Sequence, residues 1–428
     1  MKKQAYFKKG IVALLTLAMV AGTIGCSKQE SNVFAPRLDT DQHVVLNTIG
    51  FFGNFEALDQ VTNDFNTYYP NVEFSYEQVS GQSFESYMEA NPTCDIVMTS
   101  EEIYENMGSK MKNYCSNLEE VDINLSDIDK EMLKMGYHDG VLSSIPMGQN
   151  IYGMVVNVSL LEKEGLSVPT NYDEFLDVLA ALKDKGYTPI QGPDSKVYAE
   201  LTLGMACDLI LSDKKLAEQV QNGDSAAVEK LKPVLEKLKT IIDNGYTDMA
   251  VNQTYPADNY DEAILKFFEG DVPFWVCNSE KVSGMKKRET KSEAYQQNPF
   301  DYQFIYAPLG DKGGYAFQEP WFGFAVNPNS ENYEYALEFL RFLATKDEIN
   351  TIADIKGVPS VALEKTEETV YQNVLKDQKV EQRCINDGTI TAGITSCWYT
   401  SVNSYASGTM QTPEEAVEYF VTLCGELK

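Results

Sequence analysis

The sequence predicts an α/β fold in which strands and helices alternate along a chain of 428 residues. Three apolar runs, at 44–48, 72–77 and 94–98, are rich in branched and aromatic side chains, which favour strands. A segment with helical spacing of apolar residues begins near Glu56, between the first two runs. Because strands joined by helices pair in parallel, we expect a doubly wound sheet.

The alternation of strand and helix continues in the middle of the chain. A turn is predicted from Pro146 to Gly148, followed by a strand at 151–158. The next helix is predicted to begin after Asn171, whose side chain can cap it, with Glu174 completing a capping box. Gly186 suits the end of this helix.

Other parts of the chain predict further helices. Residues 101–140 are acidic and predict surface helices. Residues 199–210 and 226–244 also predict helices, and Pro233 predicts a break in the second.

Composition limits the possible partners. A chain of this length can form two or three ordinary domains or one large two-lobed one, and 43% hydrophobic residues indicate a large core. The net charge of −29 repels phosphate backbones, so nucleic acid is not an expected partner. Arginine is the residue that best captures anions, and only four are present, which disfavours an anionic ligand. They are Arg37, Arg288, Arg341 and Arg383.

The cysteine pattern does not indicate a metal site or a cofactor. None of the eight cysteines forms a CxxC pair, and the chain has only two histidines, so no zinc cluster is expected. If Cys26 is modified as described next, seven cysteines remain, and an odd number cannot all pair within the chain. Their pairing stays open.

Residues 1–25 have the pattern of a processed leader. Four lysines precede an apolar run at 11–21, which is shorter than a membrane-spanning helix, and small residues lead to Cys26. This resembles a bacterial lipoprotein signal, although Thr23 stands where leucine is usual. The resemblance implies a diacylglyceryl anchor on Cys26, followed by a polar tether at 26–43; ordinary secretion is the alternative.

Five segments resemble, in the right order, extracellular solute-binding proteins of family 1, the sugar-binding lipoproteins of ATP-binding-cassette (ABC) importers. They lie at 157–175, 263–276, 321–343, 357–360 and 396–416. The resemblance implies a type II periplasmic-binding-protein-like fold, with mixed or parallel sheets, helices on both faces and three hinge crossings between two lobes. The implied first lobe is 44–148 plus 324–360, and the implied second lobe is 149–323 plus 361–428.

Ligands of open α/β sheets bind outside the carboxyl ends of strands, so residues just after the predicted strands are candidates. A sugar needs amide or carboxylate partners for its hydroxyls and an aromatic ring for its apolar face. Both kinds occur among the candidates, which are Phe51, Asn54, Glu56, Thr99, Ser100, Glu102, Gln149, Asn150, Asn278, Glu280 and Trp321. Trp398 resembles the sugar-stacking tryptophan of maltose-type binding proteins. Core packing is the alternative for both tryptophans, and a solvent-exposed hinge for Gln149 and Asn150.

We therefore expect a monomeric, lipid-anchored protein at the extracellular face of a bacterial membrane. It would capture a carbohydrate, most simply an oligosaccharide, between its lobes and deliver it to an ABC permease. One alternative is a non-sugar solute, such as a peptide or polyamine, on the same fold. The other is a secreted hydrolase. No G-x-S-x-G motif indicates a serine nucleophile. The many acids leave a carboxylate-pair glycosidase open, but no spacing of acids indicates one, so we do not expect an enzyme.

Overall fold

The computed structural model describes residues 33–427 except 54, 81–82, 194–195, 256–258 and 366–378. The predicted leader, Cys26 and the start of the tether lie outside the described residues, as does Asn54. Within the described ranges, no helix combines the length and the apolar character that a membrane crossing requires. The same ranges contain no cluster of three or more His, Cys, Asp or Glu side chains that could hold a metal ion.

The described residues contain a sheet of nine strands in the order β2-β1-β3-β10-β6-β8-β7, with β11 beside β10 and β9 beside β6. The strands are β1 (Val44–Gly50), β2 (Val72–Gln78), β3 (Ile96–Thr99), β6 (Ile145–Asn157), β7 (Ile190–Gln191), β8 (Phe274–Asn278), β9 (Tyr302–Ile305), β10 (Gly314–Val326) and β11 (Val380–Ile385). The predicted parallel pairing of β1 with β2 and β3 is confirmed. Because β10 runs antiparallel to both β3 and β6, the sheet is mixed.

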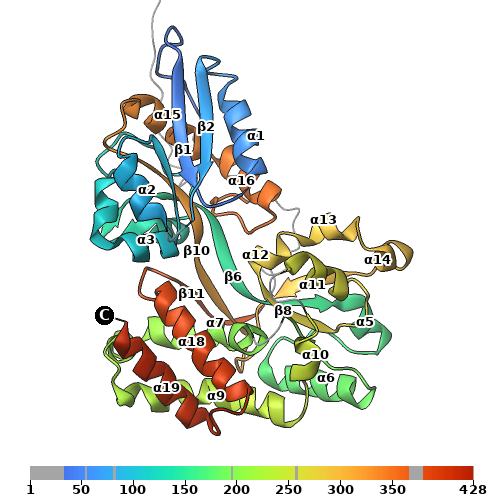
Figure 1. The fold of residues 1–428 in the computed structure, drawn as a ribbon. Helices are drawn as coiled ribbons and strands as arrows, with labels where there is room; N and C mark the ends of the chain where they lie inside the picture. The colour runs from blue at the N-terminus through green and yellow to red at the C-terminus, as the bar shows by residue number, and fades with distance from the viewer. Residues whose placement is uncertain are drawn as a thin grey trace, which may run out of the picture. The chain divides into compact units, whose positions relative to one another are not determined.

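Strands β6 and β10, each 13 residues long, connect the two halves of this sheet (Figure 1). One end of β10 pairs with β3, while the far end of β6 pairs with β8 and β9. The predicted turn from Pro146 to Gly148 is wrong, because these residues lie inside β6. A Cβ on Gly148 would lie 2.4 Å from the ring of Phe322, so this glycine permits close packing of the strands.

The first lobe, as we use the term, is the predicted range 44–148 plus 324–360. Its helices are α1 (Glu56–Phe65), α2 (Phe84–Ala90), α3 (Glu101–Met107), α4 (Lys130–Leu133), α15 (Tyr333–Leu343) and α16 (Lys346–Lys356). The prediction of helices throughout 101–140 is wrong in part. Between the short helices lie 3₁₀ turns at 108–113 and 134–136, and a small hairpin of β4 (Tyr137–His138) and β5 (Val141–Leu142).

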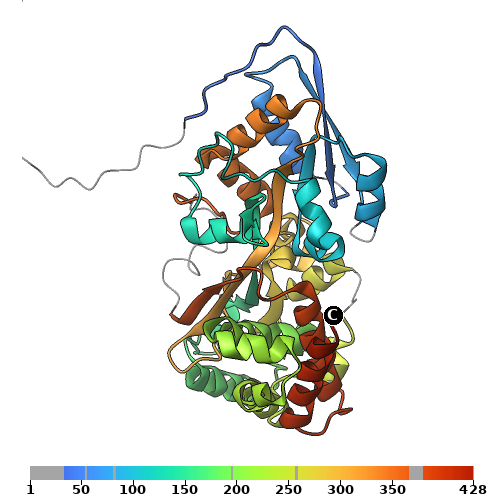
Figure 2. The ribbon, with the colours of Figure 1, turned by 90° about the vertical axis from the view of Figure 1, so that its left-hand side faces the viewer.

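The second lobe, 149–323 plus 361–428, carries most of the helices. They are α5 (Val158–Lys163), α6 (Tyr172–Asp184), α7 (Lys196–Ser212), α8 (Lys214–Gln221), α9 (Val228–Asp243), α10 (Met249–Asn252), α11 (Tyr260–Phe267), α12 (Ser279–Val282), α13 (Met285–Glu289), α14 (Glu293–Gln297), α18 (Ala392–Ala406) and α19 (Pro413–Glu426). Helices α18 and α19 lie beside α7 and α9 (Figure 2). The predicted break at Pro233 is wrong, since α9 continues through it and buries Leu231, Val234 and Leu238.

Helix caps follow the sequence signals in part. The side chain of Asn171 accepts a hydrogen bond from the Glu174 N–H at 3.0 Å, which confirms the predicted cap. The carboxylate of Glu174, however, accepts from the N–H and the hydroxyl of Thr170 rather than from Asn171. A complete capping box forms instead at α19, between Thr412 and Glu415.

Residues 33–43 of the predicted tether lie against the first lobe. The ring of Phe34 lies tilted against that of Phe65 and meets that of Phe342 edge to face. The Arg37 N–H donates to the hydroxyl of Tyr69 at 2.8 Å. This part of the chain is therefore attached to the folded body.

Candidate functional site

The first component of the site is a polar group where β6 and β10 pair. The Tyr152 hydroxyl donates to Glu319 Oε1 at 2.6 Å, and Asn150 Nδ2 donates to the same oxygen at 3.2 Å. Asn150 is 6% exposed and also donates to the Tyr152 hydroxyl at 3.2 Å. Together these three residues place a carboxylate, an amide and a phenol on the strands that join the lobes.

Glu319 is the electrostatic centre of this group. Burial raises the pKa of its carboxyl to about 7, and the charges of Glu101 and Glu280 add to this increase, while the hydrogen bonds from Tyr152 and Asn150 oppose it. Glu101 belongs to the first lobe and Glu280 to the second. Carboxylates from both lobes therefore act on one partly exposed glutamate at the crossing.

The polar group extends into the second lobe through α12. Ser279 donates to Asn150 Oδ1 at 3.1 Å, which holds the amide in place. Two residues later, the Lys281 ammonium lies 2.7 Å from Glu200 Oε1 on α7, with both side chains at least 96% buried. The Tyr399 hydroxyl of α18 donates to the same glutamate oxygen at 3.2 Å. We call Asn150, Tyr152, Glu200, Ser279, Lys281, Glu319 and Tyr399 the crossing network.

The second component is an aromatic cluster in which Phe51, Phe52 and Phe55 of the first lobe pack against Trp321 and Phe322 of β10. Phe52 contacts the rings of Phe51, Trp321 and Phe322 at centroid distances of 4.7, 5.3 and 5.3 Å. Phe51, Phe52 and Trp321 are partly exposed. Their rings are the kind of surface on which the apolar face of a sugar can stack.

Lys356 places a positive charge on the aromatic cluster. Its Nζ lies 4.0 Å from the ring centroid of Phe52 and 4.9 Å from that of Trp321, which is cation–π geometry. Burial lowers the pKa of the ammonium, while the negative charges of Glu280 and Glu56 oppose the shift. The charge of Glu280, a second-lobe residue, thus acts on this first-lobe lysine.

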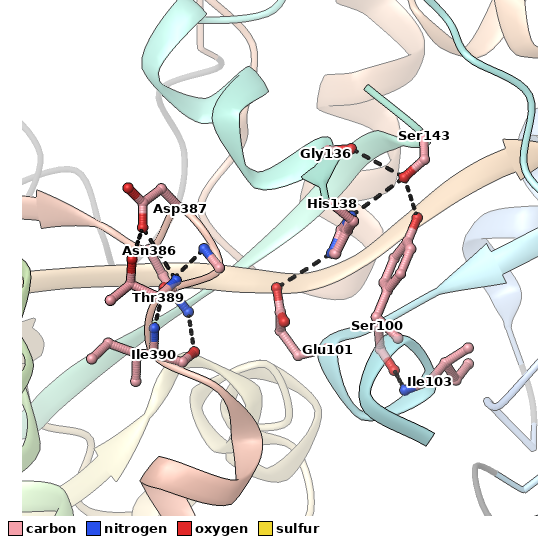
Figure 3. A network of polar contacts seen from close by, with 12 residues as sticks. Ser100, Glu101, Ile103, Gly136, His138, Ser143, Asn386, Asp387, Thr389 and Ile390 are labelled. Carbon is pink, nitrogen blue, oxygen red and sulfur yellow. Dashed lines mark hydrogen bonds and ion pairs between the residues drawn. The ribbon is translucent and has the colours of Figure 1, made fainter. Parts of the chain in front are cut away.

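Helix α3 contributes a third group of polar contacts from the first lobe (Figure 3). Ser100 caps the helix by accepting from the Ile103 N–H, and Glu101 Oε1 lies 3.5 Å from His138 Nε2. The His138 ring stacks nearly parallel on Tyr104, whose hydroxyl is 2.6 Å from that of Ser143. These bonds fix the start of α3, from which Glu101 acts on Glu319.

A loop of the second lobe before α18 is also held by its own side chains (Figure 3). Asn386 accepts from the N–H groups of Gly388 and Ile390 and donates to the Ile390 carbonyl at 2.7 Å. Beyond this loop, the N–H of Gly393 donates to the Glu105 carboxylate of α3 at 3.0 Å. This bond joins α3 of the first lobe to α18 of the second.

Two predicted site residues have structural roles. Trp398 is 1% exposed, its Nε1 donates to Thr202 at 3.1 Å, and Phe420 packs against its ring at 5.1 Å. No ring face of Trp398 is available for stacking, so core packing, the alternative interpretation, fits the structure. Gln149 is fully buried and binds the Ser360 carbonyl and Gln318 at 3.1 and 2.6 Å. The exposed-hinge interpretation is thus wrong for Gln149.

The other predicted residues divide by exposure. Glu56, Glu102 and Glu280 are exposed, Phe51, Ser100 and Trp321 are partly exposed, and Thr99 is 2% exposed on β3. Asn278 is 5% exposed, caps α12 by accepting from the Lys281 N–H, and also accepts from the Lys281 ammonium at 3.3 Å. The structure brings Asn150 into the crossing network and Phe51 and Trp321 into the aromatic cluster.

Sequence reasoning missed the central members of the crossing network. Glu319 and Tyr152 lie within strands β10 and β6, whereas the sequence rule for ligand sites applies to residues that follow strands. Glu200 lies in an apolar run of α7, where a lone acid is a signal for a buried ion pair. Lys281 lies three residues after Asn278, where β8 ends, so the rule for residues after strands could have identified it.

The two lobes thus contribute different side chains to one crossing. The sequence matches the family described as bacterial extracellular solute-binding protein over residues 60–374, and the chain belongs to this family. No curated protein sequence matches the chain significantly. The fold agrees with this membership.

Solved sugar-binding proteins share the fold at low sequence identity. RafE in complex with raffinose has a TM-score of 0.66 and 14% identity, and the match covers 90% of this chain and 99% of that one. A sugar transporter from Bacillus licheniformis, in complex with stachyose, has a TM-score of 0.64 and 18% identity over 90% of this chain and 100% of that one. The sugar-binding protein MalE from Xanthomonas citri has a TM-score of 0.69 and 14% identity, with coverage of 90% and 97%. The predicted two-lobed solute-binding fold is thus confirmed.

Proposed function

We propose that this protein captures an oligosaccharide where its two lobes meet and delivers it to the permease of an ABC importer. The observation that carries the proposal is the pairing of the crossing network with the aromatic cluster. Carboxylate, amide and phenol groups can exchange hydrogen bonds with sugar hydroxyls, while Trp321, Phe51 and Phe52 supply ring surfaces. The similar structures carry raffinose and stachyose, which favours a neutral oligosaccharide.

In this proposal, Asn150, Tyr152 and Glu319 bind hydroxyls at the crossing, and Trp321 stacks on a ring. Further contacts come from the predicted residues whose groups are accessible: Phe51, Glu56, Ser100, Glu102 and Glu280. The sugar contact that the sequence predicted for Trp398 is assigned in this proposal to its partly exposed neighbour, Tyr399. Contacts to both lobes would favour the closed state of the protein.

The proposal also includes the cellular setting. Cys26 would carry the lipid anchor, and the protein would act as a monomer at the extracellular face of the membrane. The family membership supports an extracellular location. Mass spectrometry of the protein purified from membranes tests the anchor, because a Cys26→Ser variant should lose the acyl mass and the membrane association.

One observation favours a second candidate ligand, a polyamine. The charges of Glu101 and Glu280 both act on Glu319 at the crossing, and these acidic groups could bind an amine. A thermal-shift panel of raffinose, stachyose, spermidine and a short peptide distinguishes the candidates. A ligand at about 100 times its dissociation constant adds about 2.7 kcal/mol to the free energy of unfolding. Stabilisation by a saccharide alone supports the proposal, whereas stabilisation by spermidine alone would replace it.

A further inference from the structure

A cavity lies at the first lobe, away from the crossing. Its volume is about 180 Å³, which is smaller than the 300–1,000 Å³ of ordinary ligand pockets and suits a small group rather than an oligosaccharide. It is lined by Val33, Phe34, Tyr68, Asp127, Phe342, Thr345, Lys346, Asp347 and Glu348. None of these residues belongs to the crossing network or the aromatic cluster.

Three aromatic rings form one wall of this cavity. Phe34 lies 5.1 Å from both Tyr68 and Phe342, and Tyr68 lies 6.0 Å from Phe342, with the ring planes steeply inclined. The guanidinium of Arg341 lies 5.8 Å from the Phe34 ring centroid. Aromatic walls of this kind attract organic cations through the ring quadrupole.

Glu348, in the first turn of α16, places a carboxylate against this wall. Glu348 is 9% exposed, and its Oε2 atom is buried without a hydrogen-bond partner. Burial raises the pKa of the carboxyl to about 7, and the charges of Asp64 and Asp347 raise it further. A buried carboxylate oxygen without a partner is costly, so a cation that reached it would gain a strong interaction.

The basic side chains nearest Glu348 along the chain are engaged elsewhere. Lys346 Nζ binds Glu364 at 3.1 Å, and its N–H donates to Asp127 at 2.8 Å. Arg341 forms an ion pair with Glu338. Since neither cation pairs with Glu348, the cavity keeps a negative side next to its aromatic wall.

We propose that this cavity binds an alkylammonium group. The rings of Phe34, Tyr68 and Phe342 would contact its methyl or methylene groups, and Glu348 would balance its charge. The group can come from a free amine such as choline or from the headgroup of a choline lipid. The site is independent of the oligosaccharide site at the crossing.

Calorimetric titration of the full-length protein with choline tests the proposal. The control ligand is 3,3-dimethylbutan-1-ol, which has the shape of choline without its charge. We expect saturable binding of choline that is at least about tenfold tighter than that of the neutral alcohol. No saturable binding at millimolar choline, or equal binding of the alcohol, would overturn the proposal.

Two matched variants locate the site. Glu348→Gln keeps the shape of the side chain and removes its charge, so choline should bind about tenfold or more weakly. Glu334→Gln removes an exposed charge from α15 and should leave choline affinity unchanged. If Glu348→Gln fails to fold, Tyr68→Leu tests the aromatic wall, because Tyr68 is 43% exposed. Unchanged choline affinity in the folded variant would contradict the site.

The soluble lipid dihexanoylphosphatidylcholine distinguishes the two sources of the ligand. Tighter binding of the lipid than of choline would support a headgroup as the source, and tighter binding of choline would support a free amine. Either result supports the ammonium site only if Glu348→Gln weakens binding of the ligand that bound more tightly. Oligosaccharide binding should be the same in this variant and in wild type, so the two sites can fail separately.

Discussion

The two sides of the crossing differ in chemistry. On the second-lobe side, Lys281 and Glu200 are buried and paired, and Ser279 holds Asn150. On the side facing the first lobe, Trp321, Phe51 and Phe52 are partly exposed, and Lys356 lies over the rings of Trp321 and Phe52. The comparison indicates that one side of the crossing supplies hydrogen-bonding groups fixed by buried contacts, and that the side facing the first lobe supplies ring surfaces, from Phe51 and Phe52 of that lobe and from Trp321 of β10. Substitutions on the two sides should therefore affect different measurements.

The largest effect is expected at the buried ion pair. Lys281→Met leaves the Glu200 carboxylate buried without its charged partner, which should lower the free energy of unfolding by about 3–5 kcal/mol. Urea unfolding monitored by circular dichroism measures this loss. The double variant Glu200→Leu, Lys281→Met removes both charges and should recover much of the stability. A double variant as unstable as the single one would show that packing, not charge, dominates.

Trp398 should behave as a core residue. Trp398→Ala removes a fully buried ring and its bond to Thr202, and should destabilise the protein by about 3–5 kcal/mol. Trp398→Phe should be destabilised less and should keep oligosaccharide affinity within about twofold, since no ring face is accessible to a ligand. A large loss of affinity in a stable Trp398→Phe protein would restore the stacking role that the sequence suggested.

Trp321 should show the opposite pattern. Trp321→Ala should weaken oligosaccharide binding by about tenfold, because the exposed ring supplies a stacking surface, with a small effect on unfolding. Trp321→Phe should retain part of the affinity. Calorimetry of the three proteins measures the series, and equal affinities would remove Trp321 from the site.

The smallest change per step of the experiment is expected in the pH dependence of stability caused by Glu319. Its pKa is raised from 4.5 to about 7 in the folded protein, so the folded state holds a proton that the unfolded state has lost between these values. Stability should therefore fall as pH rises through this range, by at most about 1.4 kcal/mol per pH unit from this group. Glu319→Gln should reduce the slope in unfolding experiments from pH 5 to 8. An unchanged slope would indicate that the pH dependence of stability comes from Glu348 and Asp208, whose pKa values are also raised.

Much of the fold could be predicted because local patterns and family resemblance agreed. The strands β1 and β2 and the cap at Asn171 follow from alternation and capping chemistry. The strand through Gly148 could not be read locally, because the glycine is required by the ring of Phe322 about 170 residues away in sequence. Pro233 likewise remains helical because the buried face of α9 continues on both sides of it.

The candidate site was less predictable. Residues that follow strands can be found from sequence, and this rule located Ser100, which follows β3. Asn150 was also predicted, but it lies inside β6 and not after a strand. Glu319 could not be found this way, because its importance depends on charges from Glu101 and Glu280, which are remote from it in the chain. The assignment of Trp398 to the core rests on its burial. The sequence does not show which of many aromatic residues are buried.

The most direct test is calorimetric titration of raffinose and stachyose into wild type and into a variant that combines Asn150→Ala with Trp321→Ala. One substitution removes an amide from the crossing network, and the other removes a ring from the aromatic cluster. We predict saturable binding of at least one oligosaccharide to wild type and loss of that binding in the folded variant. Oligosaccharide binding of equal strength in both proteins, or spermidine binding in place of any saccharide, would contradict a sugar site at the crossing.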